Sequence, residues 1–133
     1  MVWLLDSNAW IHYLKHADSP IRQRLTQALP VEIVTCSIVR AELLFGARKY
    51  GNAEKRTTLV LETLSPYVSY PFDEAAVAPY VEIRHELEKS GWKIGPNDLL
   101  IASICLVHNC TLVTSNESEF GRVRNLHFEN WLK

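Results

Sequence analysis

Four acidic side chains scattered along the chain are the residues best suited to chemistry, and they are Asp6, Glu42, Asp98 and Glu119. Carboxylates that come together repel one another and raise each other's pKa, so their convergence calls for a cation. Ligands that offer only oxygen suit Mg²⁺ or Mn²⁺, and Mg²⁺ retains several waters when few carboxylates hold it. The four acids therefore predict a divalent-metal site for phosphodiester hydrolysis, in which the metal generates the nucleophile and stabilises the leaving oxygen.

Each acid also has a plainer explanation. Asp6 could serve only as the N-cap of the first helix. Asp98 could be a first-turn acid that interacts favourably with the helix dipole. Glu42 and Glu119 could be solvated acids on a helix and in a turn, because Glu is almost never buried without a partner. Singly these signals are weak, and their joint placement is what favours a site.

Strand and helix patterns alternate along the chain. Short apolar runs predict strands at residues 2–5, 32–35, 67–70 and 110–114, with a possible edge strand at 126–128. The intervening patterns predict helices at residues 9–14, 21–29, 37–50 (with Ser37 as N-cap), 53–64, 73–89, 99–107 and a turn or helix at 117–120. This alternation predicts a three-layer α/β/α fold with a central parallel sheet. The helix through 99–107, with Pro96 near its first position, is apolar on all sides and is predicted to be the most buried.

The predicted elements bring the acids toward one edge of the sheet. Asp6 and Glu119 each follow a strand, Asp98 opens a helix, and Glu42 lies one turn into the helix after the second strand. In open α/β sheets the ligand crevice lies beyond the carboxyl ends of the strands. The sequence therefore predicts that the four carboxylates meet there.

Length and composition are those of one globular domain spanning residues 1–133. Hydrophobic residues make up 47% of the chain, and 14 basic residues nearly balance 15 acidic ones, so charge alone does not predict a nucleic-acid partner. The three cysteines show no C-x-x-C spacing and predict buried free thiols in a reducing compartment. No signal peptide or membrane span is apparent, so we expect a cytoplasmic protein.

Four motifs then carry a resemblance to a known family. They are Leu4-Leu-Asp6-Ser-Asn8, Arg40-Ala-Glu42-Leu-Leu-Phe-Gly46, Ile94-Gly-Pro-Asn-Asp98-Leu-Leu-Ile-Ala102 and Leu112-Val-Thr-Ser-Asn116-Glu-Ser-Glu119-Phe120. In this order they resemble the successive motifs of PIN-domain nucleases, most closely the VapC toxins of bacterial toxin–antitoxin pairs. The end of the chain, from Phe120 to Trp131, is similar to the family's closing segment. The motif around Asp98 is the most specific.

The resemblance implies a Mg²⁺- or Mn²⁺-dependent endoribonuclease that cuts structured RNA, such as tRNA or ribosomal RNA. It also implies a homodimer that a cognate antitoxin silences by laying a helix or tail into a groove beside the acids. The hydrophobic faces of residues 9–14 and 37–50 are candidate surfaces for these partners.

The resemblance also assigns the site residue by residue. Asp6, Glu42 and Asp98 match the family's three core acids. Many members carry a fourth site acid where Asn116 stands here. In this chain the fourth site residue is therefore either Glu119, with Asn116 as a polar helper, or Asn116 itself. Polar side chains that match the family's supporting positions are Ser7, Asn8 and Ser115.

Substrate contacts are less specific. Arg40 and Lys93 are candidate phosphate contacts, and Trp10, Trp92 and Tyr50 are aromatic side chains that could stack on unpaired bases. For Trp10 a place in the core or in an interface is the better explanation. Most of the cations near the motifs are better explained as ordinary solvated surface. The cations of this group are Arg40, Arg48, Lys49, Lys93, Arg122 and Arg124. The five histidines show no metal-ligand spacing.

Two other functions are compatible with the motifs. The chain could be a catalytically inactive PIN-like module that binds RNA or protein. It could also be a phosphomonoesterase in which Asp6 is the covalent nucleophile, although that chemistry usually uses a second acid two residues on, where this chain has Asn8.

Overall fold

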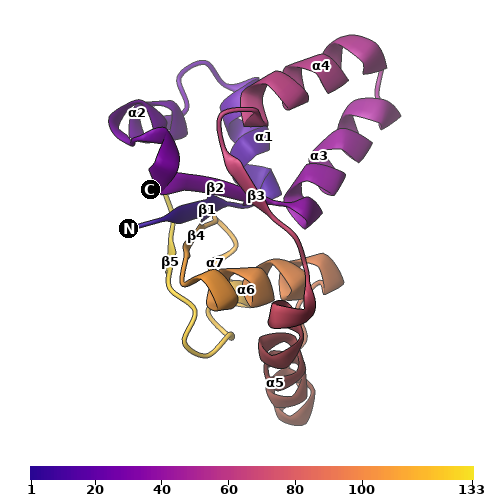
Figure 1. Cartoon of the computed structure of the whole chain (residues 1–133), viewed down its shortest axis with the longest axis vertical. Coiled ribbons are helices and arrows are strands. Elements are labelled where there is room, and N and C mark those ends of the chain that lie inside the picture. The colour runs from indigo at the N-terminus through magenta and orange to yellow at the C-terminus, as the bar shows by residue number, and fades with distance from the viewer.

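The computed structural model describes residues 1–133, and its five strands form one sheet (Figure 1). All four strand pairings are parallel, as predicted. The register places Leu4 opposite Val34 on one side and Leu112 on the other. The strands are β1 (Trp3–Leu5), β2 (Ile33–Cys36), β3 (Val68–Tyr70), β4 (Thr111–Val113) and β5 (Phe128–Glu129).

Helices cover both faces of this sheet, with α1 to α4 on one side and α5 and α6 on the other (Figure 1). This arrangement confirms the predicted three-layer fold. No helix is long and apolar enough to cross a membrane. The helices are α1 (Ser7–Lys15), α2 (Pro20–Gln27), α3 (Ser37–Lys49), α4 (Ala53–Leu64), α5 (Glu74–Ser90), α6 (Pro96–His108) and α7 (Glu117–Phe120), and a 3-10 turn occupies Pro30–Glu32.

The strand order β3-β2-β1-β4-β5 explains the two helical layers. From β1 the chain adds β2 and then β3 in one direction, and afterwards it returns to β4 on the other side of β1. Crossovers between parallel strands are right-handed, so reversing the direction of growth moves the connecting helices to the opposite face. The boundary between β1 and β4 is therefore the topological switch point of the sheet.

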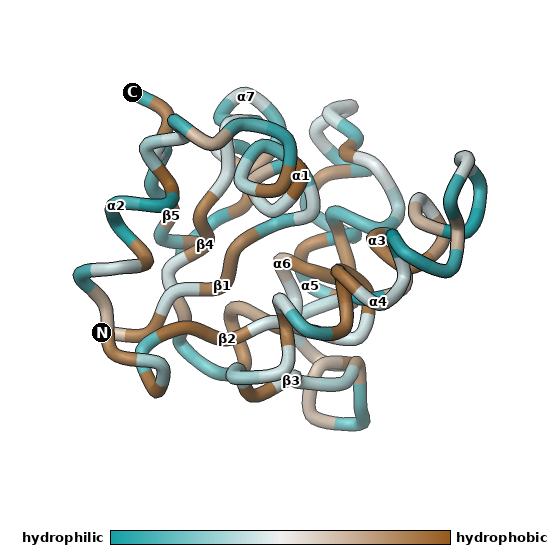
Figure 2. Tube along the Cα trace, turned by 90° about the horizontal axis from the view of Figure 1, so that it is seen from above, coloured by the Kyte–Doolittle hydropathy of each residue, from teal (hydrophilic) through white to brown (hydrophobic).

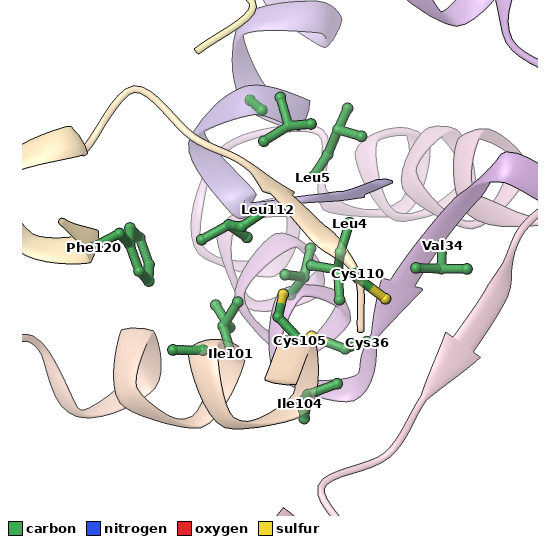
Figure 3. Packing of buried hydrophobic residues seen from close by; sticks show 14 of the residues in the cluster. Leu4, Leu5, Val34, Cys36, Ile101, Ile104, Cys105, Cys110, Leu112 and Phe120 are labelled. Atoms are coloured by element: carbon green, nitrogen blue, oxygen red, sulfur yellow. The ribbon is translucent and has the colours of Figure 1, made fainter. Parts of the chain in front are cut away.

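The core is one cluster of 28 buried residues on both faces of the sheet. Successive side chains of a strand point to opposite faces, and Leu4 and Leu5 of β1 do so in Figure 3. Hydrophobic segments run through β1, β2 and β4 in Figure 2, while hydrophilic ones occupy outer loops and helices. Helix α6 contributes six buried residues, which confirms the prediction that it is the most buried helix.

The three cysteines are buried and free, as predicted. Figure 3 shows Cys36, Cys105 and Cys110 near Leu4, in the part of the core next to α6. Burial raises the pKa of Cys105 well above the ordinary thiol value, with smaller contributions from the other two thiols. They therefore behave as small apolar side chains of the core.

Two local predictions differ from the structure. Helix α3 begins at Ser37, and its N-cap is Cys36 with no side-chain capping bond, so the assignment of Ser37 as the cap was wrong. The last strand begins at Phe128, because Asn125 adopts a left-handed conformation (φ 68°) and Leu126 lies in the core. Helix α1 begins at Ser7, directly after its N-cap Asp6, and α6 begins at Pro96, so both start where Asp6-Ser7-Asn8 and Gly95-Pro96 indicated.

Candidate functional site

The carboxyl ends of β1 and β4, on either side of the switch point, position the acidic residues. Asp6 directly follows β1, and Glu119 lies on α7, which follows β4. Asp98 lies in the first turn of α6. Glu42 lies on α3, which follows β2, the other neighbour of β1. Each predicted site acid therefore comes from a different element, at the edge where open α/β folds bind ligands.

Asp6 is both a helix cap and a member of the acid cluster. Its Oδ1 accepts a hydrogen bond of 2.9 Å from the Ala9 amide, so the plain reading as the N-cap of α1 is correct. The side chain is only 5% exposed. Burial raises its pKa, and the charge of Glu42 raises it further, while hydrogen bonds from Thr114 and the Ala9 amide oppose the shift. The cap and the cluster share one carboxylate.

Glu42 is held by two uncharged donors. The Ser7 hydroxyl donates to its Oε1 over 2.6 Å, and the Asn97 amide donates to its Oε2 over 3.3 Å. Ser7 follows Asp6 and Asn97 precedes Asp98, so these bonds tie Glu42 to the segments of both neighbouring acids. The half-buried Glu42 therefore points toward the switch point rather than into solvent.

Asp98 and Glu119 contact each other directly. Burial, a hydrogen bond with Glu119 and the charges of the other acids raise the pKa of Asp98 to about 7. The Asn116 amide donates a short hydrogen bond to Oε2 of Glu119. Two carboxyl groups can share a hydrogen bond only when one of them carries a proton. Asp98 therefore retains its proton at a pH where isolated carboxyl groups have lost theirs.

No positive side chain neutralises the cluster. The ion pairs of the protein are formed by Arg24, Arg84, Arg124 and Lys133, and none involves a site acid. The chemistry of the donor set, four carboxylates with uncharged hydrogen-bond donors, fits a hard divalent cation. In the metal-free arrangement no three His, Cys, Asp or Glu side chains are placed to hold an ion together. A bound cation would have to displace the proton of the Asp98 carboxyl group.

The predicted supporting residues divide into two groups. Ser7 and Asn116 donate to site acids, as described. Asn8 and Ser115 are exposed, and neither side chain forms a hydrogen bond within the protein. Sequence reasoning missed Asn97 and Thr114 as direct contacts, although both lie inside the motifs. Their signals were the amide beside Asp98 and a buried hydroxyl at the end of β4.

The candidate substrate residues are also unequal. Trp10 is fully buried in the core, so it cannot stack on a base. Tyr50 and Trp92 are 58% and 60% exposed. Arg40 is half-buried and Lys93 exposed, and neither side chain forms an ion pair. Two aromatic side chains therefore remain as candidates for stacking on a base, Tyr50 after α3 and Trp92 before α6.

An apolar cavity of about 360 Å³ opens between α1, α3 and α4. Its wall includes Ile11, Leu14, Leu43 and Leu59, and Glu42 stands at its rim. The cavity thus connects hydrophobic surface with one of the site acids. It includes parts of both helix faces that the sequence suggested for partner contacts, residues 9–14 and 37–50.

Comparison with known proteins identifies this combination of fold and site. The sequence pattern of the PIN domain matches residues 3–126 of this chain. The fold with an acid cluster at its switch point is therefore that of a PIN-domain protein. Ribonuclease VapC2 of Rickettsia felis is 40% identical over 134 residues and covers both chains completely. The tRNA(fMet)-specific endonuclease VapC of Shigella flexneri is 30% identical, with 97% of each chain covered.

Solved structures agree with the sequence relatives. The crystal structure of VapBC2 from Rickettsia felis, bound to a DNA fragment from its promoter, contains a chain that superposes with a TM-score of 0.91 at 36% identity. The match covers 98% of this chain and 99% of that one. The chain therefore belongs to the VapC ribonuclease toxins of toxin–antitoxin systems, which confirms the resemblance found in the motifs.

Proposed function

We propose that this chain is a Mg²⁺- or Mn²⁺-dependent endoribonuclease of structured RNA, with Asp6, Glu42, Asp98 and Glu119 as its metal ligands. The observation that carries the proposal is the cluster of acids from separate elements, which no cationic side chain neutralises. A divalent cation relieves that repulsion, and phosphate oxygens can complete its coordination. The cation, when bound, supplies an activated water and neutralises developing charge on the phosphate.

The chain's own residues have positioning roles in this proposal. The Ser7 and Asn97 hydrogen bonds orient Glu42, and Asn116 orients Glu119. Glu119 is thus the fourth acid and Asn116 its partner. The α1 cap fixes the carboxylate of Asp6. Such supporting bonds set ligand orientation and carry much of a metal site's affinity.

Two relatives bear names that specify a tRNA(fMet) substrate. We include that tRNA among the candidate substrates of this chain, together with other tRNAs and ribosomal RNA. We also propose that a cognate antitoxin inhibits the enzyme by inserting apolar side chains into the cavity beside Glu42, and that the toxin is a homodimer whose protomer, residues 1–133, is one nuclease domain. The solved VapBC2 and VapBC-1 complexes support the antitoxin part of this proposal.

Asp6 is poorly placed for the phosphomonoesterase alternative. A covalent nucleophile must reach its substrate, whereas Asp6 is 5% exposed and one of its oxygens caps α1. This geometry favours a ligand that orients a cation over a group that attacks phosphorus.

The decisive experiment compares Asp98→Asn with Glu117→Gln. Both substitutions remove a carboxylate, but Glu117 pairs with Lys133 and Asn130 and contacts no site acid. We expect the wild type and Glu117→Gln to cut tRNA in Mg²⁺ or Mn²⁺ and to arrest growth, whereas Asp98→Asn should do neither. Sequencing of RNA ends after induction then identifies the cleaved RNA.

Two outcomes would contradict the proposal. Full cleavage by Asp98→Asn would show that the assigned site is wrong. Binding of RNA by the wild type without cleavage in either metal would favour the inactive binding module instead. A circular dichroism spectrum of each variant controls for folding.

A further inference from the structure

An exposed tryptophan with a cation stacked on it precedes α6. Trp92 is 60% exposed, whereas Trp10 and Trp131 are buried. The Arg122 guanidinium lies over the Trp92 ring, 4.9 Å from its centroid. The same guanidinium donates a 2.8 Å hydrogen bond to the carbonyl oxygen of Lys93. These two contacts fix a surface arginine against a surface indole.

The stacked pair joins the two segments that carry Asp98 and Glu119. On one side, the Arg122 amide donates to the Glu119 carbonyl oxygen over 3.1 Å. On the other, Gly95 lies against the carboxylate of Asp98, where an added Cβ would meet Oδ2 at 3.5 Å. Gly95 is only two residues from Lys93, a chain distance of roughly 7 Å. A short stretch of single-stranded RNA can therefore reach from the pair to the acids.

The positive charges at this place are not held in ion pairs, although Lys93 lies close enough to Glu88 to lower the pKa of that carboxyl group. Neither Arg122 nor Lys93 forms an ion pair, and the bond from Arg122 is to a neutral carbonyl. Arginine keeps its charge while it stacks, so its remaining donors can bind phosphate. Proteins bind unpaired nucleotides without sequence preference by stacking the bases on aromatic side chains and binding the phosphates with nearby cations.

We propose that Trp92, Lys93 and Arg122 form a platform that stacks one unpaired base of the RNA and binds its adjacent phosphate beside the acid cluster. This inference rests on the proposed ribonuclease function and adds a substrate contact to it. The unpaired cations favour a polyanion here, in contrast to the apolar cavity next to Tyr50 on the other side of Glu42.

Binding is measured first, with a fluorescein-labelled oligouridylate as the single-stranded probe. The Asp98→Asn protein in Mg²⁺ serves as the background, because it should bind RNA without cutting it. Adding Trp92→Leu should weaken binding roughly tenfold, since loss of a stacking aromatic has about that cost. Adding Trp92→Phe should leave the Kd within about threefold, because phenylalanine still stacks. Adding Arg122→Gln should reduce the slope of the logarithm of the binding constant against the logarithm of salt concentration by about 1, because one phosphate contact is lost.

Tyr50→Leu in the same background is the matched control. Tyr50 is 58% exposed and has its own stacked cation, Lys49, at 5.7 Å from its ring centroid. The platform predicts no change of the Kd for this variant. Unlabelled oligouridylate should also quench tryptophan fluorescence in the Asp98→Asn protein and lose most of that quenching in Trp92→Phe, since Trp92 is the exposed tryptophan.

Cleavage then separates this inference from the proposed function. In an otherwise wild-type enzyme, Trp92→Leu should raise KM for RNA about tenfold with little change in kcat, because stacking away from the reacting phosphate is uniform binding. Unchanged oligouridylate binding by Trp92→Leu, or equal weakening by Trp92→Leu and Trp92→Phe, would overturn the platform even while the wild type cuts RNA. A wild type that cuts no RNA would instead overturn the proposed function.

Discussion

Asp6 and Glu42 are each held at the switch point by uncharged donors, whereas Asp98 faces the carboxyl group of Glu119, which itself accepts a bond from Asn116. The first pair has its bonds from Ala9, Thr114, Ser7 and Asn97 without any cation. In the second pair, burial and neighbouring carboxyl groups raise the pKa of Asp98 to about 7. The site thus has one half whose geometry is set by the fold and another half that a metal ion is expected to rearrange.

The comparison can first be tested by removing an acid from each half. We expect Asp6→Asn and Asp98→Asn each to lower RNA cleavage in Mg²⁺ by more than about a hundredfold, since even supporting residues of metal sites often contribute 10- to 100-fold. Steady-state cleavage of a tRNA substrate measures this. If only one substitution reduced the rate, the two halves would not form one site.

Removing a side chain that donates a hydrogen bond to a site acid should give the next largest loss of RNA cleavage. Removing the hydroxyl in Ser7→Ala frees Glu42, and removing the amide in Asn116→Ala frees Glu119. We expect each to reduce cleavage roughly 10- to 100-fold through weaker metal binding, which titration with Mn²⁺ would report. Asn8→Ala and Ser115→Ala are the matched controls, because these exposed side chains form no hydrogen bond within the protein. Equal losses in the controls would contradict the assigned roles.

The free energy of unfolding should change in opposite directions when an acid is removed from each half of the site. Asp6→Ala removes the α1 cap, so the free energy of unfolding should fall by about 1 kcal/mol. Asp98→Asn removes a repelled carboxylate, so the metal-free protein should become more stable at pH 8. Urea unfolding in EDTA measures both values. A less stable Asp98→Asn protein would mean that the cluster is not strained without metal.

The smallest expected effect is the pH dependence of the metal-free protein. The folded-state pKa of Asp98 is about 7, above its ordinary value of 3.8, so the folded state binds this proton more tightly than the unfolded state. Its stabilising contribution is complete below about pH 4 and is lost as the pH rises to about 7. The Tm in EDTA should therefore fall over this window, and less so in Asp98→Asn. An identical slope of Tm against pH in both proteins would contradict the raised pKa of Asp98.

Local pattern predicted the elements better than it predicted their exact ends. Helix α4 begins and ends where the sequence indicated, because its apolar face and flanking turn residues are local signals. Helix α3 begins without a side-chain cap, and the last strand lies two residues later than predicted. At these places tertiary packing, such as the burial of Leu126, outweighed the local preference.

Residue types and their spacing were enough to predict the three-layer class, the family and the four candidate acids, because they are local properties of the chain. The polar neighbours that contact those acids follow from the folded arrangement, since the strand order places segments far apart in sequence at one switch point. The contacts of Glu42 with Ser7 and Asn97 span 35 and 55 residues. Contacts over such separations arise from the packing of helices on the sheet, which no motif specifies.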